Sequence, residues 1–233
     1  MGFTENIIQE LNSFSTEEKK EHLPKFFKSG KGQYGEGDKF LGVVVPDTRR
    51  IAKQYKDASF EEIAGLIRNE YHECRLCALL ILVEKFKKSD ENGRKQIVDF
   101  YLNHTKFINN WDLVDLSCKD ILGEYLADKE RSLLYILAES ELLWEQRIAV
   151  VSTFAFIRRK DLNDIFLLSE KLMSHRHDLM HKAIGWMLRE AGKRDRNALI
   201  DFLDKNYKTM PRTMLRYSIE KLTLEERAFY MKK

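Results

Sequence analysis

Residues that interrupt helices are scarce in this chain, and so are long hydrophobic runs. Its 233 residues include three prolines and 11 glycines, while 43% are hydrophobic and 11% aromatic. No apolar run approaches the roughly 20 residues that a membrane-spanning helix needs, and the amino end, MGFTENIIQELNSF, lacks the basic head and apolar stretch of a secretory signal. These features exclude a disordered chain and a membrane protein. We expect a single cytoplasmic domain over residues 1–233.

Cysteine is also scarce, which excludes a fold held together by disulfides. The chain has three cysteines, and an odd number makes no disulfide framework. Cys74 and Cys77 have C-x-x-C spacing, but they have no second pair and no nearby histidine ligand. His175 and His177 fall in an expected loop without an acidic or cysteine partner at ligand spacing. We therefore predict buried, unreactive thiols and no bound metal, with a zinc or redox role for the C-x-x-C pair as the alternative.

Positive and negative charges are nearly balanced. The chain has 40 Lys and Arg residues and 37 Asp and Glu residues, which gives a formal net charge of +3. Such a balance does not by itself indicate a nucleic-acid partner. The distribution is uneven: residues 181–233 hold 13 basic and 7 acidic side chains, whereas residues 1–180 hold 27 and 30. The carboxyl-terminal quarter therefore carries the basic surface, although ordinary solvated helix faces would give the same pattern.

Signals for helix starts recur along the whole chain. Capping boxes are predicted at Ser15 with Glu18, Ser59 with Glu62, and Thr223 with Glu226, and Pro46 suits the first turn of a helix. Residues 29–45, SGKGQYGEGDKFLGVVV, depart from this pattern, since five glycines precede a short β-branched run. We interpret this segment as an ordered loop that could include a short extended piece. Its glycines do not follow a strand of a βαβ unit, so they are not typical of a phosphate-binding loop.

A repeat appears when the helical segments are aligned on their apolar stripes. Segments that begin at Arg75, Trp111, Arg147 and Lys182 are separated by 36, 36 and 35 residues. The segments between them, residues 90–102, 131–140 and 161–173, also have apolar residues three and four apart, which indicates further helices. Two helices fit in each period. The sequence thus predicts an all-α fold, an α-solenoid of antiparallel HEAT-like helix pairs with a concave inner face.

The repeat register places chemically active side chains at equivalent positions. Positions 111, 147 and 182 correspond to one another, as do positions 115, 151 and 186, one helical turn further on. One side of three neighbouring helices should therefore carry Trp111, Asp115, Arg147, Lys182 and Trp186. A packing role is the alternative, because tryptophan often lies in cores and Asp112 or Asp115 could cap the helix that begins near Asn110.

Three short motifs at these positions resemble a known family, the AlkD-like DNA alkylation-repair glycosylases. They are WDLVD at residues 111–115, WEQR at residues 144–147 and KAIGWMLRE at residues 182–190, in the family's order and spacing. The resemblance covers roughly residues 45–220. Two departures are visible: Asn110 stands where some members have an aromatic residue, and the glycine-rich loop is long. The family also includes members that bind DNA poorly or lack glycosylase activity.

Carried across to this chain, the resemblance implies specific roles. Trp111 and Trp186 would flank the sugar of the damaged nucleotide, which stays stacked in the duplex. Asp115 would be the catalytic carboxylate, and Arg147 would lie in the same cleft. No metal and no organic cofactor would be needed.

Basic residues of the later repeats are candidates for contacts with DNA phosphates, which position a protein without reading sequence. They are Arg147, Lys182, Arg189, Arg212 and Arg216. We predict a monomeric, monofunctional DNA glycosylase that removes cationic N3- or N7-alkylated purines from double-stranded DNA containing alkylated bases. The alternative is a non-catalytic HEAT-like repeat protein that binds damaged DNA or a protein partner.

Overall fold

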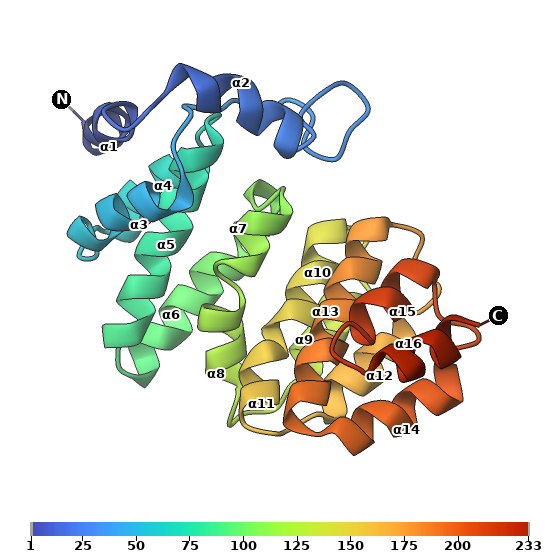
Figure 1. Ribbon diagram of the computed structural model, residues 1–233. Coiled ribbons are helices and arrows are strands. Elements are labelled where there is room, and N and C mark those ends of the chain that lie inside the picture. Colours follow the sequence, from blue (N-terminus) through green and yellow to red (C-terminus); the bar gives the residue numbers. More distant parts are fainter. Residues whose placement is uncertain (1, 233) are drawn as a thin grey trace. The chain divides into compact units, whose positions relative to one another are not determined.

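The computed structural model describes residues 2–232 and divides into two compact units, with the boundary between Ser117 and Cys118. Helices form the regular structure of both units (Figure 1). No strand occurs among residues 2–232; a single isolated parallel bridge joins Lys39 to Tyr71. The predicted all-α class is confirmed. That the whole chain is one domain stays a prediction, and each unit is described by itself.

The first unit is built around one long, buried helix, α5. Its helices are α1 (Phe3–Asn12), α2 (Glu17–Phe26), α3 (Val45–Gln54), α4 (Phe60–Ile67), α5 (His72–Lys88), α6 (Glu91–Leu102), a 3-10 turn (Thr105–Phe107) and α7 (Trp111–Asp115). Helices α3, α4, α6 and α7 all pack against α5. Its side chains are therefore buried on almost every side, which explains its nearly continuous apolar sequence between Leu76 and Val83.

The second unit is organised around α13 in the same way. It contains a π-helical turn (Lys119–Gly123), α8 (Glu124–Leu126), α9 (Ser132–Ala138), α10 (Leu143–Ser152), α11 (Phe154–Arg158), α12 (Asn163–Lys171), α13 (Asp178–Arg194), α14 (Arg196–Asn206), α15 (Arg212–Ser218) and α16 (Leu224–Met231). Helix α13 contacts α10, α11, α12, α14 and α15. A Cβ added at Gly185 would lie 2.5 Å from the Met214 carbonyl oxygen, so α13 and α15 approach closely because this residue is glycine.

The predicted repeat corresponds to these helices. Its aligned segments lie in α5, α7, α10 and α13, and the intervening segments lie in α6, α9 and α12. Short connections join α9 to α10 and α12 to α13, whose members pack together as helix pairs. One equivalent helix is much shorter than the others, because α7 ends at Asp115 after five residues. None of the helices in residues 2–232 is long and apolar enough to cross a membrane.

The structure confirms two of the three predicted capping boxes and corrects the third. Ser59 and Thr223 begin α4 and α16 as expected, and Pro46 lies in the first turn of α3. The prediction for Ser15 is wrong: Thr16 caps α2, and the Ser15 hydroxyl instead donates a hydrogen bond to the Leu41 carbonyl. Ser15 and Thr16 are adjacent and either hydroxyl could cap the helix. Because the Ser15 hydroxyl is bonded to the loop, Thr16 supplies the cap.

The glycine-rich segment at residues 29–45 is ordered, as predicted, and its last residue already belongs to α3. The buried carboxylate of Glu73 on α5 accepts hydrogen bonds from the backbone N–H groups of Leu41, Gly42 and Val43 at 2.9, 2.9 and 3.1 Å. Gly42 has φ +86°, a left-handed conformation that favours glycine. The extended piece is limited to the bridge between Lys39 and Tyr71. The loop is thus fixed to the amino-terminal end of α5.

Candidate functional site

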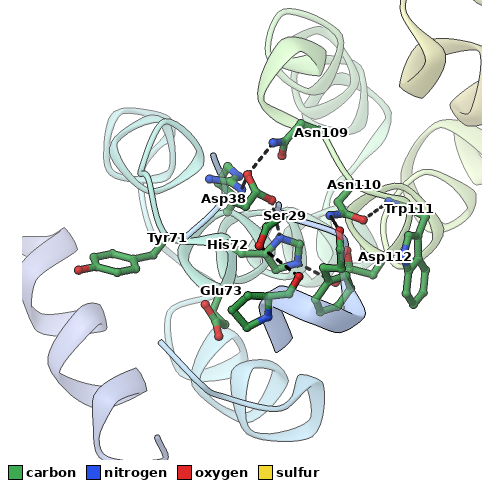
Figure 2. Close-up of polar contacts among 12 residues, drawn as sticks. Ser29, Asp38, Tyr71, His72, Glu73, Asn109, Asn110, Trp111 and Asp112 are labelled. Atoms are coloured by element: carbon green, nitrogen blue, oxygen red, sulfur yellow. Dashed lines mark hydrogen bonds and ion pairs between the residues drawn. The ribbon is translucent and has the colours of Figure 1, made fainter. Parts of the chain in front are cut away.

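Helix α7 begins at a buried cap and carries a half-buried indole on its first residue. The Asn110 side-chain oxygen accepts a hydrogen bond of 2.9 Å from the Trp111 N–H, and Asn110 itself is fully buried (Figure 2). The Trp111 ring packs against Phe26 and Phe27, with centroid distances of 5.7 and 5.4 Å. Sequence analysis did not select these two phenylalanines, because nothing in their spacing relates them to Trp111.

Asp115 is the last residue of α7, one helical turn after Trp111, and its side chain is half-buried. Its carboxylate and the indole therefore lie on the same side of one short helix. The capping role considered for Asp112 or Asp115 is wrong, since Asn110 supplies the cap. Asp112 points elsewhere, into the interior of the first unit.

Beneath α7 lies a buried ionic network that links three segments of the first unit. The imidazole of His72, 1% exposed, contacts Asp112 Oδ2 through Nε2 at 2.8 Å and Asp38 Oδ2 through Nδ1 at 3.2 Å (Figure 2). Asp38 Oδ1 also accepts a hydrogen bond of 2.7 Å from Asn109 Nδ2, and it lies 2.7 Å from an Arg75 guanidinium nitrogen. The glycine-rich loop, α5 and α7 are joined at this point.

The network holds His72 in its charged form at neutral pH. Burial acts to lower the pKa of His72, but the charge and hydrogen bond of Asp112, with the hydrogen bond to Asp38, outweigh it and raise the pKa to about 9. Burial acts to raise the pKa of Asp38, but its hydrogen bonds and the Arg75 charge prevail and lower it. An imidazolium with both N–H groups donating fits both contact distances.

In the second unit, the other predicted tryptophan lies on α13. Trp186 is half-buried and packs at a tilt against Phe154 of α11, with 6.3 Å between ring centroids. Near the amino-terminal end of the same helix, Lys182 forms an ion pair of 2.8 Å with Asp178, and its side chain is 40% exposed.

Arg147 reaches the same end of α13 from α10. It is only 5% exposed and donates a hydrogen bond of 2.6 Å to the Leu179 carbonyl. Burial lowers the pKa of His177 most, and Arg147 and Lys182 lower it further against the opposing charge of Asp178. Arg147 and Lys182 therefore place positive charge near the start of α13, beside the negative charge of Asp178.

The remaining predicted cations differ in how they are held. Arg189 is ion-paired with Glu220, and Arg212 donates a hydrogen bond of 3.0 Å to the Met231 carbonyl. Arg216 is exposed on α15. Arg216 is therefore the exposed member of the predicted set, while the Lys182 side chain is 40% exposed and paired with Asp178.

Comparison with known proteins decides the family. The sequence model described as "DNA alkylation repair enzyme" matches residues 7–222, nearly the whole chain. The chain belongs to the DNA alkylation repair enzyme family. A solved structure titled "Predicted DNA alkylation repair enzyme from Enterococcus faecalis" is similar, with a TM-score of 0.69 and 16% sequence identity, covering 90% of this chain and 97% of that one. At this identity the likeness shows the fold. No curated protein matches.

Membership confirms the resemblance stated from the three motifs, and with it a role in repair of alkylation damage and DNA as a partner. Within this family member, the structure brings Trp111 and Asp115 together in the first unit, and Arg147 and Lys182 together in the second. That residues of both units meet at one cleft stays a prediction. Cys74 and Cys77 are buried thiols, as predicted, and burial raises the pKa of Cys74 to about 12.

Proposed function

We propose that this family member is a monofunctional glycosylase that hydrolyses the N-glycosidic bond of cationic N3- or N7-alkylated purines in duplex DNA, acting as a monomer and without a metal or organic cofactor. One observation carries the proposal: a half-buried carboxylate, Asp115, lies one turn from a half-buried indole, Trp111, on a helix whose first turn is anchored in the core. Such a pair suits a reaction in which positive charge develops on a sugar.

The chemistry needs one carboxylate because of the leaving group. Ordinary glycoside hydrolysis uses two carboxyl groups, one to protonate the departing oxygen and one to assist the sugar or its attacking water. An N3- or N7-alkylated purine is already cationic and leaves as a neutral base, so no general acid is required. Asp115 stabilises the oxocarbenium-like transition state and orients or deprotonates the water that attacks the sugar.

The tryptophans account for a preference for cationic lesions. The face of an indole carries negative electrostatic potential, and a cation over it gains about 0.5–2 kcal/mol, depending on how far it is desolvated. In the repeat register Trp186 corresponds to Asp115, one helical turn after Trp111, and both tryptophans are half-buried. We propose that both act on the same nucleotide, one from each unit.

The cations of the second unit hold the DNA backbone. The exposed Arg216 contacts phosphates directly, while Lys182, Arg189 and Arg212 do so by exchanging their present partners. Arg147 is held by the Leu179 carbonyl and contributes its charge to the amino-terminal end of α13. Such contacts bind any duplex and position the lesion without reading bases.

A base-release assay tests the proposal. Methylated duplex DNA is incubated with the protein, and free 7-methylguanine and 3-methyladenine are measured by chromatography. We expect release above the spontaneous rate, lowered by either Trp111→Ala or Trp186→Ala and unchanged by Phe229→Ala, which removes an exposed ring from α16. Salt-dependent duplex binding without release would instead support a non-catalytic DNA-binding member. Neither release nor binding would support a protein-binding repeat.

A further inference from the structure

His72 joins the glycine-rich loop to the helix that bears the proposed catalytic pair. It begins α5, and its two ring nitrogens face carboxylates that come from different segments, Asp38 in the loop and Asp112 in α7. Neither the motifs nor the roles implied by the family resemblance involve this histidine. Its place in the proposed function therefore needs a separate explanation.

Helix α7 depends on contacts outside itself. It has five residues, too few for a helix to be stable alone. Its buried anchors are the apolar side chains of Leu113 and Val114, the Asn110 cap, and the carboxylate of Asp112, which is 3% exposed. Asp112 Oδ2 contacts His72, and Asp112 Oδ1 has no hydrogen-bond partner within residues 2–232. The contact with His72 is thus the hydrogen bond that fixes this carboxylate.

A second route leads from His72 to the indole. The imidazole stacks on Phe27, with ring centroids 4.7 Å apart, and Phe27 in turn packs against Trp111 at 5.4 Å. Phe40 stacks on His72 as well, at 5.0 Å. The position of the histidine therefore influences α7 through Asp112 and the Trp111 ring through Phe27.

We propose that His72 is a positioning residue: as an imidazolium held between Asp38 and Asp112, it fixes α7 so that Trp111 and Asp115 keep the geometry that excision requires. The inference rests on the proposed function for its effect on catalysis, but its effect on α7 can be measured without DNA. His72 does not touch the substrate. It acts through Asp112 and Phe27.

The charge of His72 is the essential property. A neutral imidazole has one N–H and can donate to only one of the two carboxylates. Loss of the proton would leave Asp38 with Arg75 and Asn109 but would weaken one of the two links that His72 makes. The charged groups that face the ring are Asp38 from the loop, Asp112 from α7 and Arg75 from α5 itself. With the pKa of His72 raised to about 9, both hydrogen bonds are present at neutral pH and one of them is lost in alkaline solution.

The first experiment follows α7 directly. In the full chain with Trp144→Phe and Trp186→Phe, Trp111 is the sole tryptophan, and its fluorescence is recorded from pH 7 to pH 10.5. We expect a transition centred near pH 9 that is absent after His72→Gln. His104→Gln is the matched control, because His104 is also buried in the first unit but bonds to the Phe100 carbonyl and faces Arg68, not a carboxylate. The control should keep the transition.

The second experiment measures catalysis in the chain with all its tryptophans. His72→Gln should lower single-turnover excision of 7-methylguanine by about tenfold or more, since small displacements of reacting groups are costly, while duplex affinity stays within about twofold. His104→Gln should leave both unchanged.

Each outcome has a defined meaning. A folded His72→Gln protein that keeps the fluorescence transition, or that excises within about twofold of the parent protein, overturns the inference. If the parent protein excises nothing, the proposed function fails, but the fluorescence experiment still tests the link to α7. If His72→Gln does not fold, Asp38→Asn replaces it: removing this charge should move the transition below pH 9, and an unmoved transition overturns the inference.

Discussion

The buried charge of His72 makes a specific contribution to stability that depends on pH. Its pKa rises from its ordinary value of 6.5 to about 9 in the folded protein. At 1.36 kcal/mol per unit, this corresponds to about 3 kcal/mol, and burial of the ring leaves little solvent to screen it. Because the folded-state pKa is raised, the contribution is complete below pH 6.5. It is lost as the pH rises through 9, so most of the loss falls between pH 7 and pH 10.

Urea unfolding at several pH values, followed by Trp111 fluorescence in the single-tryptophan protein, measures this loss. Other groups also titrate here: buried thiols such as Cys74 ionise on unfolding above pH 9, and Tyr55, with its pKa raised to about 12, contributes above pH 10. Both groups remain in the His72→Gln variant. The difference in unfolding free energy between parent and variant therefore isolates the histidine.

We expect the parent protein to lose about 2–3 kcal/mol more than His72→Gln between pH 7 and pH 10. His104→Gln should lose as much as the parent, because its imidazole has no carboxylate partner among the described contacts. If parent and His72→Gln lose stability in parallel, to within about 0.5 kcal/mol, across this range, then the charge of His72 does not stabilise the fold.

Three further substitutions test other parts of the account. Gly185→Ala should lower the free energy of unfolding in urea by about 1–3 kcal/mol, because the added methyl group would meet the Met214 carbonyl; an unchanged midpoint would contradict the close approach of α13 and α15. Asn110→Ala removes the α7 cap and should cost about 1 kcal/mol in the same assay, whereas a neutral result would show that the cap is dispensable. Lys182→Ala should weaken binding to all duplexes alike and reduce the slope of log affinity against log salt by about 1 in an anisotropy titration. Lys87→Ala of the first unit is the control. A loss confined to particular sequences would argue against a phosphate contact.

The helices and their repeat could be predicted because their signals are local. Apolar residues recur at helical spacing in the segments of α5, α10 and α13, and the capping boxes at Ser59 and Thr223 place the two hydroxyls three residues before their glutamates. Trp111 and Asp115 could be paired for the same reason, since one helical turn separates them. Ser15 shows where local signals fail, because its hydroxyl donates a hydrogen bond to the distant Leu41 carbonyl and does not cap the helix.

The support beneath the candidate site could not be predicted in this way. His72 is 34 residues from Asp38 and 40 from Asp112, and no periodicity relates a loop residue to two helix starts. His72 belongs to the network only because the loop folds onto α5. The Glu73 carboxylate fixes the loop there by accepting hydrogen bonds from three of its backbone N–H groups. The aromatic neighbours of Trp111 are hidden from sequence analysis for the same reason: Phe26 and Phe27 come from the end of α2.

Asp115→Asn keeps the shape of the side chain and removes the charge proposed to stabilise the sugar cation, so its excision rate tests whether Asp115 is the catalytic carboxylate. Single-turnover release of 7-methylguanine is measured beside duplex affinity, with Asp99→Asn, an exposed carboxylate of α6, as the control. We expect Asp115→Asn to lower the rate by about 10²–10³, roughly 3–4 kcal/mol, with affinity and the control unchanged. A rate within about twofold of the parent protein, a difference below about 0.5 kcal/mol, would contradict the account.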